Sequence, residues 1–234
     1  MGVINDPDLE ELLAKLHHRS VAQQAEVKRY YDERAKRAGY DEKVAAAGDK
    51  AFLSDKMVAL DRDKAEFCYQ LCRAGNARRV VEIGTSFGVS TLYLAAAVRD
   101  NIRAGGGSGL VIGTEYEHRK AVEALKNLKD ARLDGFVDLR EGDLRESLQQ
   151  VEGPVDFVLI DIWIAMARPA LERVHPHLRI GAQVVCDNTE RYRETYAEYF
   201  SFLADPANGF STMTLPFDGG LELSVMARRS TKTN

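Results

Sequence analysis

Hydrophobic residues recur along this chain with two different periods. Residues 8–38 carry leucines on one stripe with charged residues elsewhere, which predicts an amphipathic helix. A shorter helix and a loop are expected in residues 41–60, and another helix begins at Asp61. We therefore divide the chain into a helical cap or dimerisation segment, residues 1–60, and a main domain, residues 61–234.

From residue 78 onward, strand and helix patterns alternate. The predicted strands are residues 78–84, 110–115, 136–143, 155–161 and 182–188, and the helices between and after them are residues 90–98, 118–128, 170–178 and 192–203. In the helix at 118–128, we expect Val122, Leu125 and Leu128 to share one face. Strict alternation predicts a mainly parallel sheet with helices on both faces. Residues 210–217 and 221–228 flank an Asp-Gly-Gly turn, which predicts a closing hairpin with an antiparallel last strand.

Five predicted strands in succession end in an acidic residue. These residues are Glu82, Glu115, Asp143, Asp161 and Asp187, the last of which is followed by Asn188. Ligands of such sheets bind outside the carboxyl ends of the strands. One acid could be a solubilising loop charge, but five at the same edge favour a binding site.

The turn after the first predicted strand contains Gly84, Ser86 and Gly88. Small residues let a ligand approach the backbone, and the N-terminus of the next helix favours a negative group. A dinucleotide fingerprint would need glycine at 84, 86 and 89, so Ser86 and Val89 disfavour a pyrophosphate. A ligand with one carboxylate suits this turn better, with Ser90 as a hydroxyl donor.

The other strand-end acids extend this interpretation. Glu82 could attract an ammonium group, Glu115 could accept both hydroxyls of a ribose, and Asp143 could accept from an exocyclic amine. Carboxylate, ammonium, ribose and aminopurine together describe S-adenosylmethionine.

Asp161, Asp187 and Asn188 are expected to meet at the ends of neighbouring strands. Two carboxylates and an amide suit a hard cation such as Mg²⁺ that keeps open positions for water or substrate. The alternative for Asp161 is a carboxylate that caps the following helix.

Several motifs resemble the class I S-adenosylmethionine-dependent O-methyltransferases of the catechol and caffeoyl-CoA type, especially the small bacterial ones. The motifs are VVEIGTSFGVST, GTEYE, EGDLRESL, LIDIW, VVCDN and the closing hairpin, within about residues 60 to 228. The resemblance implies a Rossmann-like sheet of seven strands, a reversed last strand and a homodimer. It also implies cofactor contacts at Glu82, Gly84, Ser90, Glu115 and Asp143. In the resembling family Asp161, Asp187 and Asn188 hold a divalent metal, and Trp163 borders the adenine.

One position departs from that family. Metal-dependent members commonly carry a lysine base one residue after the tryptophan, and this chain has Ile164. A general base typically contributes about 10²–10⁴ in rate. Asp187, His118 or a residue of the N-terminal segment could take the proton, or a bound cation could acidify the hydroxyl.

Composition narrows the class of partner. The formal charge of −4 and the pI near 5.8 supply no basic field for nucleic acid. No apolar run reaches the length of a membrane span, and the N-terminus lacks the regions of a signal peptide, so we expect a cytoplasmic protein. The three cysteines lack metal-ligand or redox spacing and are expected to be buried thiols.

The sequence therefore predicts an S-adenosylmethionine-dependent O-methyltransferase, with a divalent metal and a small hydroxylated substrate. Three alternatives stay open: methyl transfer without a metal, a cofactor-binding protein that has lost catalysis, and a nicotinamide oxidoreductase. The missing glycines count against the third. In the first alternative, Asp161 and Asp187 would act by hydrogen bonding alone.

Overall fold

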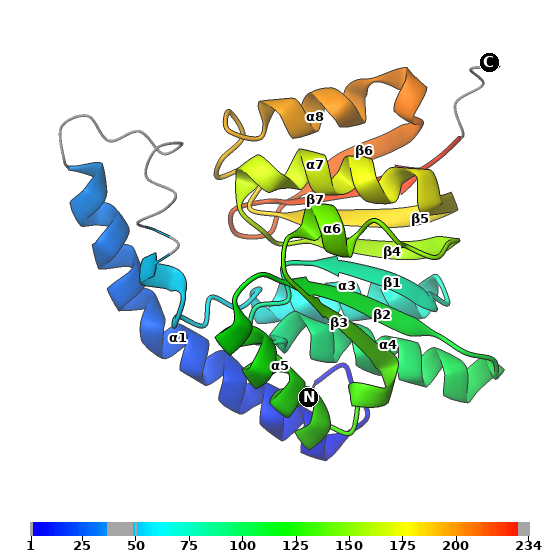
Figure 1. The fold of residues 1–234 in the computed structure, drawn as a ribbon, viewed down its shortest axis with the longest axis horizontal. Helices are drawn as coiled ribbons and strands as arrows, with labels where there is room; N and C mark the ends of the chain where they lie inside the picture. The colour runs from blue at the N-terminus through cyan, green and yellow to red at the C-terminus, as the bar shows by residue number, and fades with distance from the viewer. Residues whose placement is uncertain (1, 37–48, 50, 229–234) are drawn as a thin grey trace.

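A computed structural model describes residues 2–36, 49 and 51–228 (Figure 1). Its centre is a seven-stranded sheet in the order β3-β2-β1-β4-β5-β7-β6. The strands are β1 (Arg79–Ile83), β2 (Leu110–Glu115), β3 (Val137–Glu141), β4 (Val155–Ile160), β5 (Leu178–Asp187), β6 (Phe210–Leu215) and β7 (Leu221–Met226). β7 runs antiparallel to both of its neighbours, whereas β1 to β5 pair in parallel. The predicted fold class is confirmed.

Helices cover both faces of this sheet (Figure 1). They are α1 (Pro7–Ala35), α3 (Arg62–Ala74), α4 (Val89–Gly105), α5 (His118–Asp130), α6 (Leu144–Ser147), α7 (Ile164–Val174) and α8 (Ala197–Ala204). Short 3₁₀ turns occupy Asp134–Phe136, His175–His177 and Pro206–Asn208.

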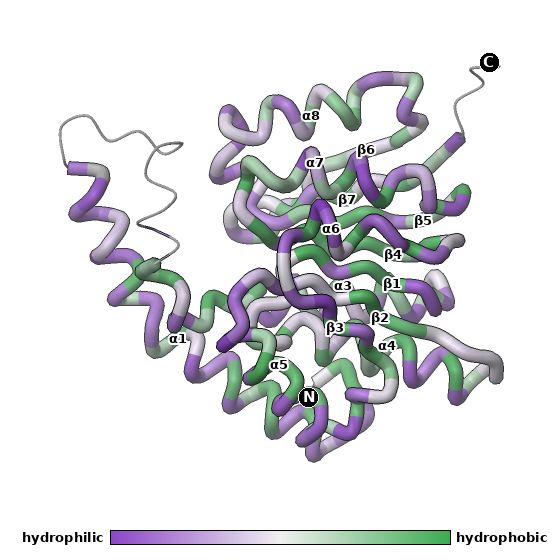
Figure 2. The backbone as a smooth tube through the Cα atoms, viewed as in Figure 1, coloured by the Kyte–Doolittle hydropathy of each residue, from purple (hydrophilic) through white to green (hydrophobic). Residues whose placement is uncertain are grey.

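Alternate residues of the strands point into two separate hydrophobic cores. Val80 belongs to the core cluster that includes residues of α1, α3 and α4, while its neighbour Val81 belongs to the cluster that includes residues of α7 and α8. This division follows from the two-residue period of a strand. The central strands are almost continuously apolar (Figure 2) because both of their faces are covered.

The N-terminal helix forms as predicted, with Asp6 as its N-cap, and ends at Ala35. Its leucine stripe turns inward, with Leu9, Leu13 and Leu16 buried. Arg99 of α4 ties the two helices together through an ion pair of 2.7 Å to Asp6. Residues 37–38 of the predicted helix, and residues 41–48 and 50 of the element expected in residues 41–60, lie outside the described residues.

Val122, Leu125 and Leu128 do not share one environment on α5, as the prediction of a common face would require. Val122 and Leu125 are 51% and 40% exposed, whereas Ala121, Ala124 and Leu128 are buried. The cause is the close approach of α5 to the turn before α4. A Cβ on Gly88 would lie 3.1 Å from the Cβ of Ala124, so only a small residue fits on the inward face.

Two other helices begin at residues different from those expected. α7 starts at Ile164 instead of residue 170, directly after Trp163, and continues through Pro169. α8 starts at Ala197 instead of residue 192, because a turn comes first, in which the Tyr192 amide donates to the Asn188 carbonyl. No helix in the described part of the chain is long and apolar enough to cross a membrane.

Candidate active site

The carboxyl ends of β1 and β4 press against each other at Gly84. Its φ is +98°, and a Cβ added there would lie 2.0 Å from the carbonyl oxygen of Asp161. The Asp161 amide in turn donates to the Ile83 carbonyl at 3.0 Å. Glycine is therefore required at 84 by the backbone of the next strand, and the two predicted site segments are in direct contact.

Glu82 is fully buried within a cage of hydroxyl groups. Ser90 donates to Oε1 at 2.6 Å, and Thr85 and Thr91 donate to Oε2. Burial raises the pKa of this carboxyl, the three hydroxyl groups oppose the rise, and the charge of Glu115 adds to it. Ser90 thus serves Glu82 here, a role that its position near the helix start did not reveal.

Glu115 holds the same turn from the end of β2. Its carboxylate accepts from the Ser86 amide and from the Glu117 amide, both at 2.7 Å. Ser86 has a φ of +50°, which is uncommon for a residue other than glycine. The predicted ribose acceptor therefore lies beside the predicted glycine turn, as expected of a shared ligand site.

Asp143 occupies a different environment from the other strand-end acids. It caps α6 by accepting from the Arg145 amide at 2.9 Å, and its carboxylate also pairs with the Arg145 guanidinium. These bonds lower the pKa of Asp143 to about 2. The carboxylate is thus ionised and already has a partner, which any exocyclic amine would have to share.

Residues 57–60, just before α3, lie over the glycine turn. Together with residues 84–87, Val89, Ser90 and Asp161 they line a cavity of about 10 Å³. Side chains of α1 hold this segment, because Gln23 accepts from the Met57 amide at 2.7 Å and Ser20 accepts from the Ala59 amide at 3.2 Å. The N-terminal segment therefore contributes to the site, which no motif in it had indicated.

Asp161 and Asp187 end up side by side. β4 and β5 are parallel with Ile160 opposite Cys186, so the next residue of each strand is one of the two acids. Burial raises the pKa of both carboxyls. For Asp161 the charges of Asp187 and Glu82 add to the rise, and the pKa lies well above its usual range.

Asn188 follows in the left-handed region, with a φ of +57°. Its side-chain amide donates to Oδ2 of Asp187 at 2.7 Å. Two adjoining carboxylates and this amide have the donor chemistry of a hard-cation site. Among the described residues no group of three His, Cys, Asp or Glu side chains forms a metal site, so the amide would have to complete the set.

The sequence reasoning missed Lys64. This side chain of α3 is 1% exposed, and its Nζ lies 2.7 Å from Oδ1 of Asp187 and 3.3 Å from Oδ2 of Asp61. Burial alone would lower its pKa, but the two carboxylates outweigh burial and raise it, so the ammonium stays charged. A basic residue among apolar ones on a helix face was the available signal.

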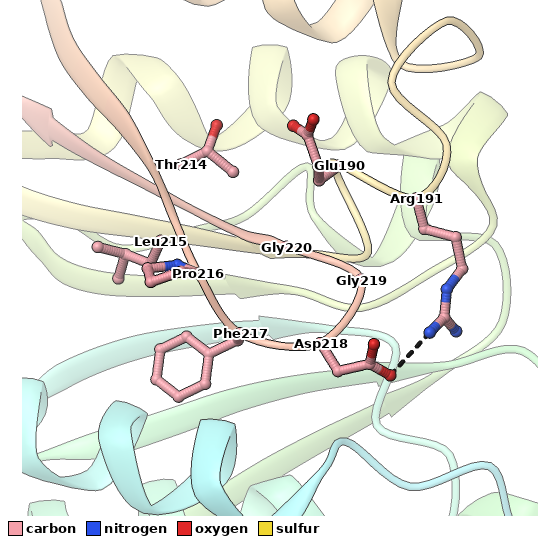
Figure 3. A pocket seen from close by; sticks show the side chains of 9 residues that line it. All are labelled: Glu190, Arg191, Thr214, Leu215, Pro216, Phe217, Asp218, Gly219 and Gly220. Atoms are coloured by element: carbon pink, nitrogen blue, oxygen red, sulfur yellow. Dashed lines mark hydrogen bonds and ion pairs between the residues drawn. The ribbon is translucent and has the colours of Figure 1, made fainter.

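A hollow of about 600 Å³ is lined by Glu190, Arg191, and residues 214–220 from the end of β6 and the β6–β7 connection (Figure 3). It lies next to Asn188, because a Cβ added to Gly219 of the lining would be 2.6 Å from Oδ1 of Asn188. The Gly219 carbonyl accepts from the amides of Glu190 and Arg191, both at 2.9 Å, which fastens the connection to the end of β5. Arg191 also pairs with Asp218 at 2.7 Å.

Trp163 and Ile164 complete the region after β4. Trp163 is 41% exposed and caps α7, so its indole ring is available to a ligand. Ile164 is half-buried and packs against the core under α7. Nothing at this position can accept a proton.

Comparisons with known proteins agree with this geometry. A family model described as a methyltransferase domain matches residues 81–189. A catechol O-methyltransferase of Niastella koreensis is 28% identical over 162 residues, 65% of this chain and 69% of that protein. A catechol O-methyltransferase of Mycobacterium tuberculosis is 33% identical over 147 residues, 62% of this chain and 63% of that protein.

Solved structures share the fold. An O-methyltransferase from Bacillus cereus, in complex with SAH, superposes with a TM-score of 0.64 at 22% identity, covering 90% of this chain and 99% of its own. The O-methyltransferase TomG from Streptomyces achromogenes, in complex with SAM, gives 0.65 at 21% identity, covering 87% and 96%. The chain is therefore similar in sequence to catechol O-methyltransferases, carries a match to a methyltransferase domain over residues 81–189, and shares the fold of these S-adenosylmethionine-dependent enzymes.

Proposed function

We propose that this enzyme methylates a hydroxyl oxygen of a small hydroxylated molecule, with a divalent cation held by Asp161, Asp187 and Asn188. The observation that carries the proposal is the pairing of the buried Asp187 with the half-buried Asp161 at adjoining strand ends, directly against the Gly84 turn. Burial opposes the charge of both carboxyls, which a bound cation would offset.

The chain's own residues would hold the methyl donor around that turn. Glu82 and Glu115 would receive its ammonium and ribose, and Trp163 would border its adenine. S-adenosylmethionine supplies a methyl carbon on a positively charged sulfur. The substrate oxygen would form the new bond to that carbon as the carbon–sulfur bond breaks, with the electron pair left on sulfur and the hydroxyl proton lost.

The protein's task at the acids is to orient the hydroxyl and assist loss of its proton. A cation bound by Asp161, Asp187 and Asn188 would supply Lewis acidity, which matters because Ile164 offers no base. The preferred substrates should therefore be chelating and already fairly acidic, as catechols are.

The hollow beside Asn188 is our candidate for the body of the substrate. Its volume of about 600 Å³ suits a small organic molecule. Leu215, Pro216 and Phe217 offer apolar contacts, and the ion pair of Arg191 and Asp218 offers polar ones (Figure 3). The earlier expectations of a homodimer and a cytoplasmic location remain predictions.

The test is a methyl-transfer assay with S-adenosylmethionine and a panel of catechols, monophenols and alcohols, each with and without a chelator. We expect methylated catechols, and loss of product with chelator that added Mg²⁺ restores. Turnover that a chelator leaves unchanged would favour transfer without metal. Calorimetry that finds tight NAD binding and no response to S-adenosylhomocysteine would contradict the whole proposal.

A further inference from the structure

The buried lysine of α3 is the feature that the proposed reaction does not yet use. Lys64 lies on the inward face of α3 with Ala65, Cys68 and Cys72, all buried. Its ammonium crosses from this helix layer to the sheet edge and reaches Oδ1 of Asp187 at 2.7 Å. An apolar residue would continue the core at this position.

A buried ion pair is a weak way to stabilise a fold. Desolvating an ammonium and a carboxylate can outweigh their attraction, and well-packed apolar side chains often replace such pairs without loss. The contact of Lys64 with Asp187 therefore calls for a role beyond packing. Lys64 also has a second carboxylate partner, Asp61, whose side chain is 45% exposed and whose Oδ2 lies 3.3 Å from the same Nζ.

Lys64 also completes the set of hydrogen bonds that fixes Asp187. The ammonium holds Oδ1, the Asn188 amide holds Oδ2 at 2.7 Å, and the Tyr196 hydroxyl donates to the backbone carbonyl at 3.1 Å. Asp161, opposite, receives no side-chain hydrogen bond from any described residue. One acid of the pair is thus held in a single orientation while the other is left for a ligand.

We propose that Lys64 is a positioning residue for methyl transfer. Its ammonium fixes the rotamer of Asp187 and offsets part of the negative charge that Asp161 and Asp187 place beside the substrate oxygen. The role rests on the proposed reaction, because it concerns the hydroxyl that this pair of acids would orient. Without Lys64, Oδ1 of Asp187 would lose the charged hydrogen bond that fixes the orientation of the carboxylate.

The first experiment compares Lys64→Met with Arg99→Met. Arg99 is a matched control, a buried cation with two carboxylate partners, Asp6 at 2.7 Å and Asp100 at 2.9 Å. Loss of one charged hydrogen bond predicts that Lys64→Met lowers kcat about 10- to 100-fold. Affinity for S-adenosylhomocysteine should stay within about threefold of wild type by calorimetry. Arg99→Met should lower the melting temperature and keep kcat below that temperature.

The second experiment is chemical rescue of Lys64→Ala. Ethylammonium, which can fill the space of the missing side chain with a positive end, should raise kcat with saturation, whereas propanol of similar size should not. A purely structural lysine would respond to neither or to both. If Lys64→Met does not fold, Lys64→Ala purified in ethylammonium decides the question by the same comparison.

Wild-type kcat in Lys64→Met, or equal rescue by propanol, would overturn the positioning role while leaving the proposed function intact. A wild-type enzyme that methylates no compound of the hydroxylated panel fails the proposed function itself, and the role of Lys64 falls with it.

Discussion

The two ends of β4 each carry a partly or fully buried aspartate, and the two are held in opposite ways. Asp156, near the start, accepts from the Arg78 and Arg79 amides at 2.8 Å and from the Arg179 guanidinium at 2.6 Å. Asp161, just past the end, receives no side-chain hydrogen bond from the described residues, and burial beside Asp187 raises its pKa well above the usual range.

The difference separates an acid that joins strands from one that we propose to bind a ligand. Asp156, whose oxygens accept from two amides and a guanidinium, joins β1, β4 and β5 at their starts. Asp161 is half-buried, short of donors and next to another acid, which is unfavourable unless a ligand satisfies it. Asp187 and Glu82 lie at the same edge but have donors of their own, so the lack of partners distinguishes Asp161 from them.

The largest expected effect is a loss of catalysis on substitution of Asp161, just past the carboxyl end of β4. Asp161→Asn should lower kcat by about 10²–10⁴, the range for loss of a group that assists proton transfer. The melting temperature should stay the same or rise, because the amide removes a charge that burial opposes. Steady-state kinetics and calorimetric unfolding measure both, and a fully active Asp161→Asn would remove the acid from the mechanism.

The matched substitution of Asp156, near the start of β4, should lower the free energy of unfolding and leave catalysis unchanged. Asp156→Asn loses a charged partner of two amides and a guanidinium, so we expect a loss of about 1–3 kcal/mol in the free energy of unfolding. Its kcat at a temperature where it is folded should equal that of wild type. Denaturant titration gives the stability, and a large drop in kcat would break the distinction between the two ends.

Glu82 sharpens the comparison through pH. Its pKa in the folded protein is raised by burial, so the folded state binds the proton more tightly than the unfolded state. The stability that this proton contributes is present at low pH and is lost as pH rises through the raised pKa. Affinity for the cofactor's ammonium should change in the opposite direction and increase over the same window, because it needs the ionised carboxylate.

Calorimetric titration of S-adenosylhomocysteine across pH measures this window. Glu82→Gln should bind more weakly, by about tenfold, and with a flat pH dependence. An equally steep dependence in Glu82→Gln would assign the titration to another group.

The smallest effect is expected at Ile164. Ile164→Lys should raise the rate on weakly acidic phenols by a few-fold and change little on acidic catechols, since those need less help to lose a proton. The pH–rate profiles of both forms on a series of catechols make the comparison. A gain that is the same for all substrates would point to an altered binding pocket instead of a new base.

Much of this architecture could be predicted from the spacing of apolar residues and from the acids at the strand ends. The alternation of strands and helices predicted the sheet. The terminal acids indicated the edge where the candidate site lies, because parallel strands bring their carboxyl ends together. The hydrogen-bond partners of these acids could not be predicted. Neither the hydroxyl cage of Glu82 nor the contact of Lys64 with Asp187 has a local signature, since the latter joins residues 123 positions apart.

The buried face of a helix could be predicted from hydropathy only where close packing did not require small side chains. Val122 and Leu125 look like the inward face of α5 by hydropathy, yet Ala121 and Ala124 are inside, because α5 has to approach Gly88 closely. That approach is a tertiary distance, which no window of sequence contains.

The amides of Met57 and Ala59, which donate hydrogen bonds to Gln23 and Ser20, can report on movement of residues 57–60. The cavity beneath that segment has a volume of about 10 Å³, far less than a nucleoside, so we expect the segment to lift if S-adenosylmethionine binds beside Gly84 as proposed. Lifting it breaks the bonds at the Met57 and Ala59 amides, which then exchange with solvent deuterium. The hydrogen-exchange rate of these two amides would therefore measure how often residues 57–60 move away, without the need for a methyl-transfer assay.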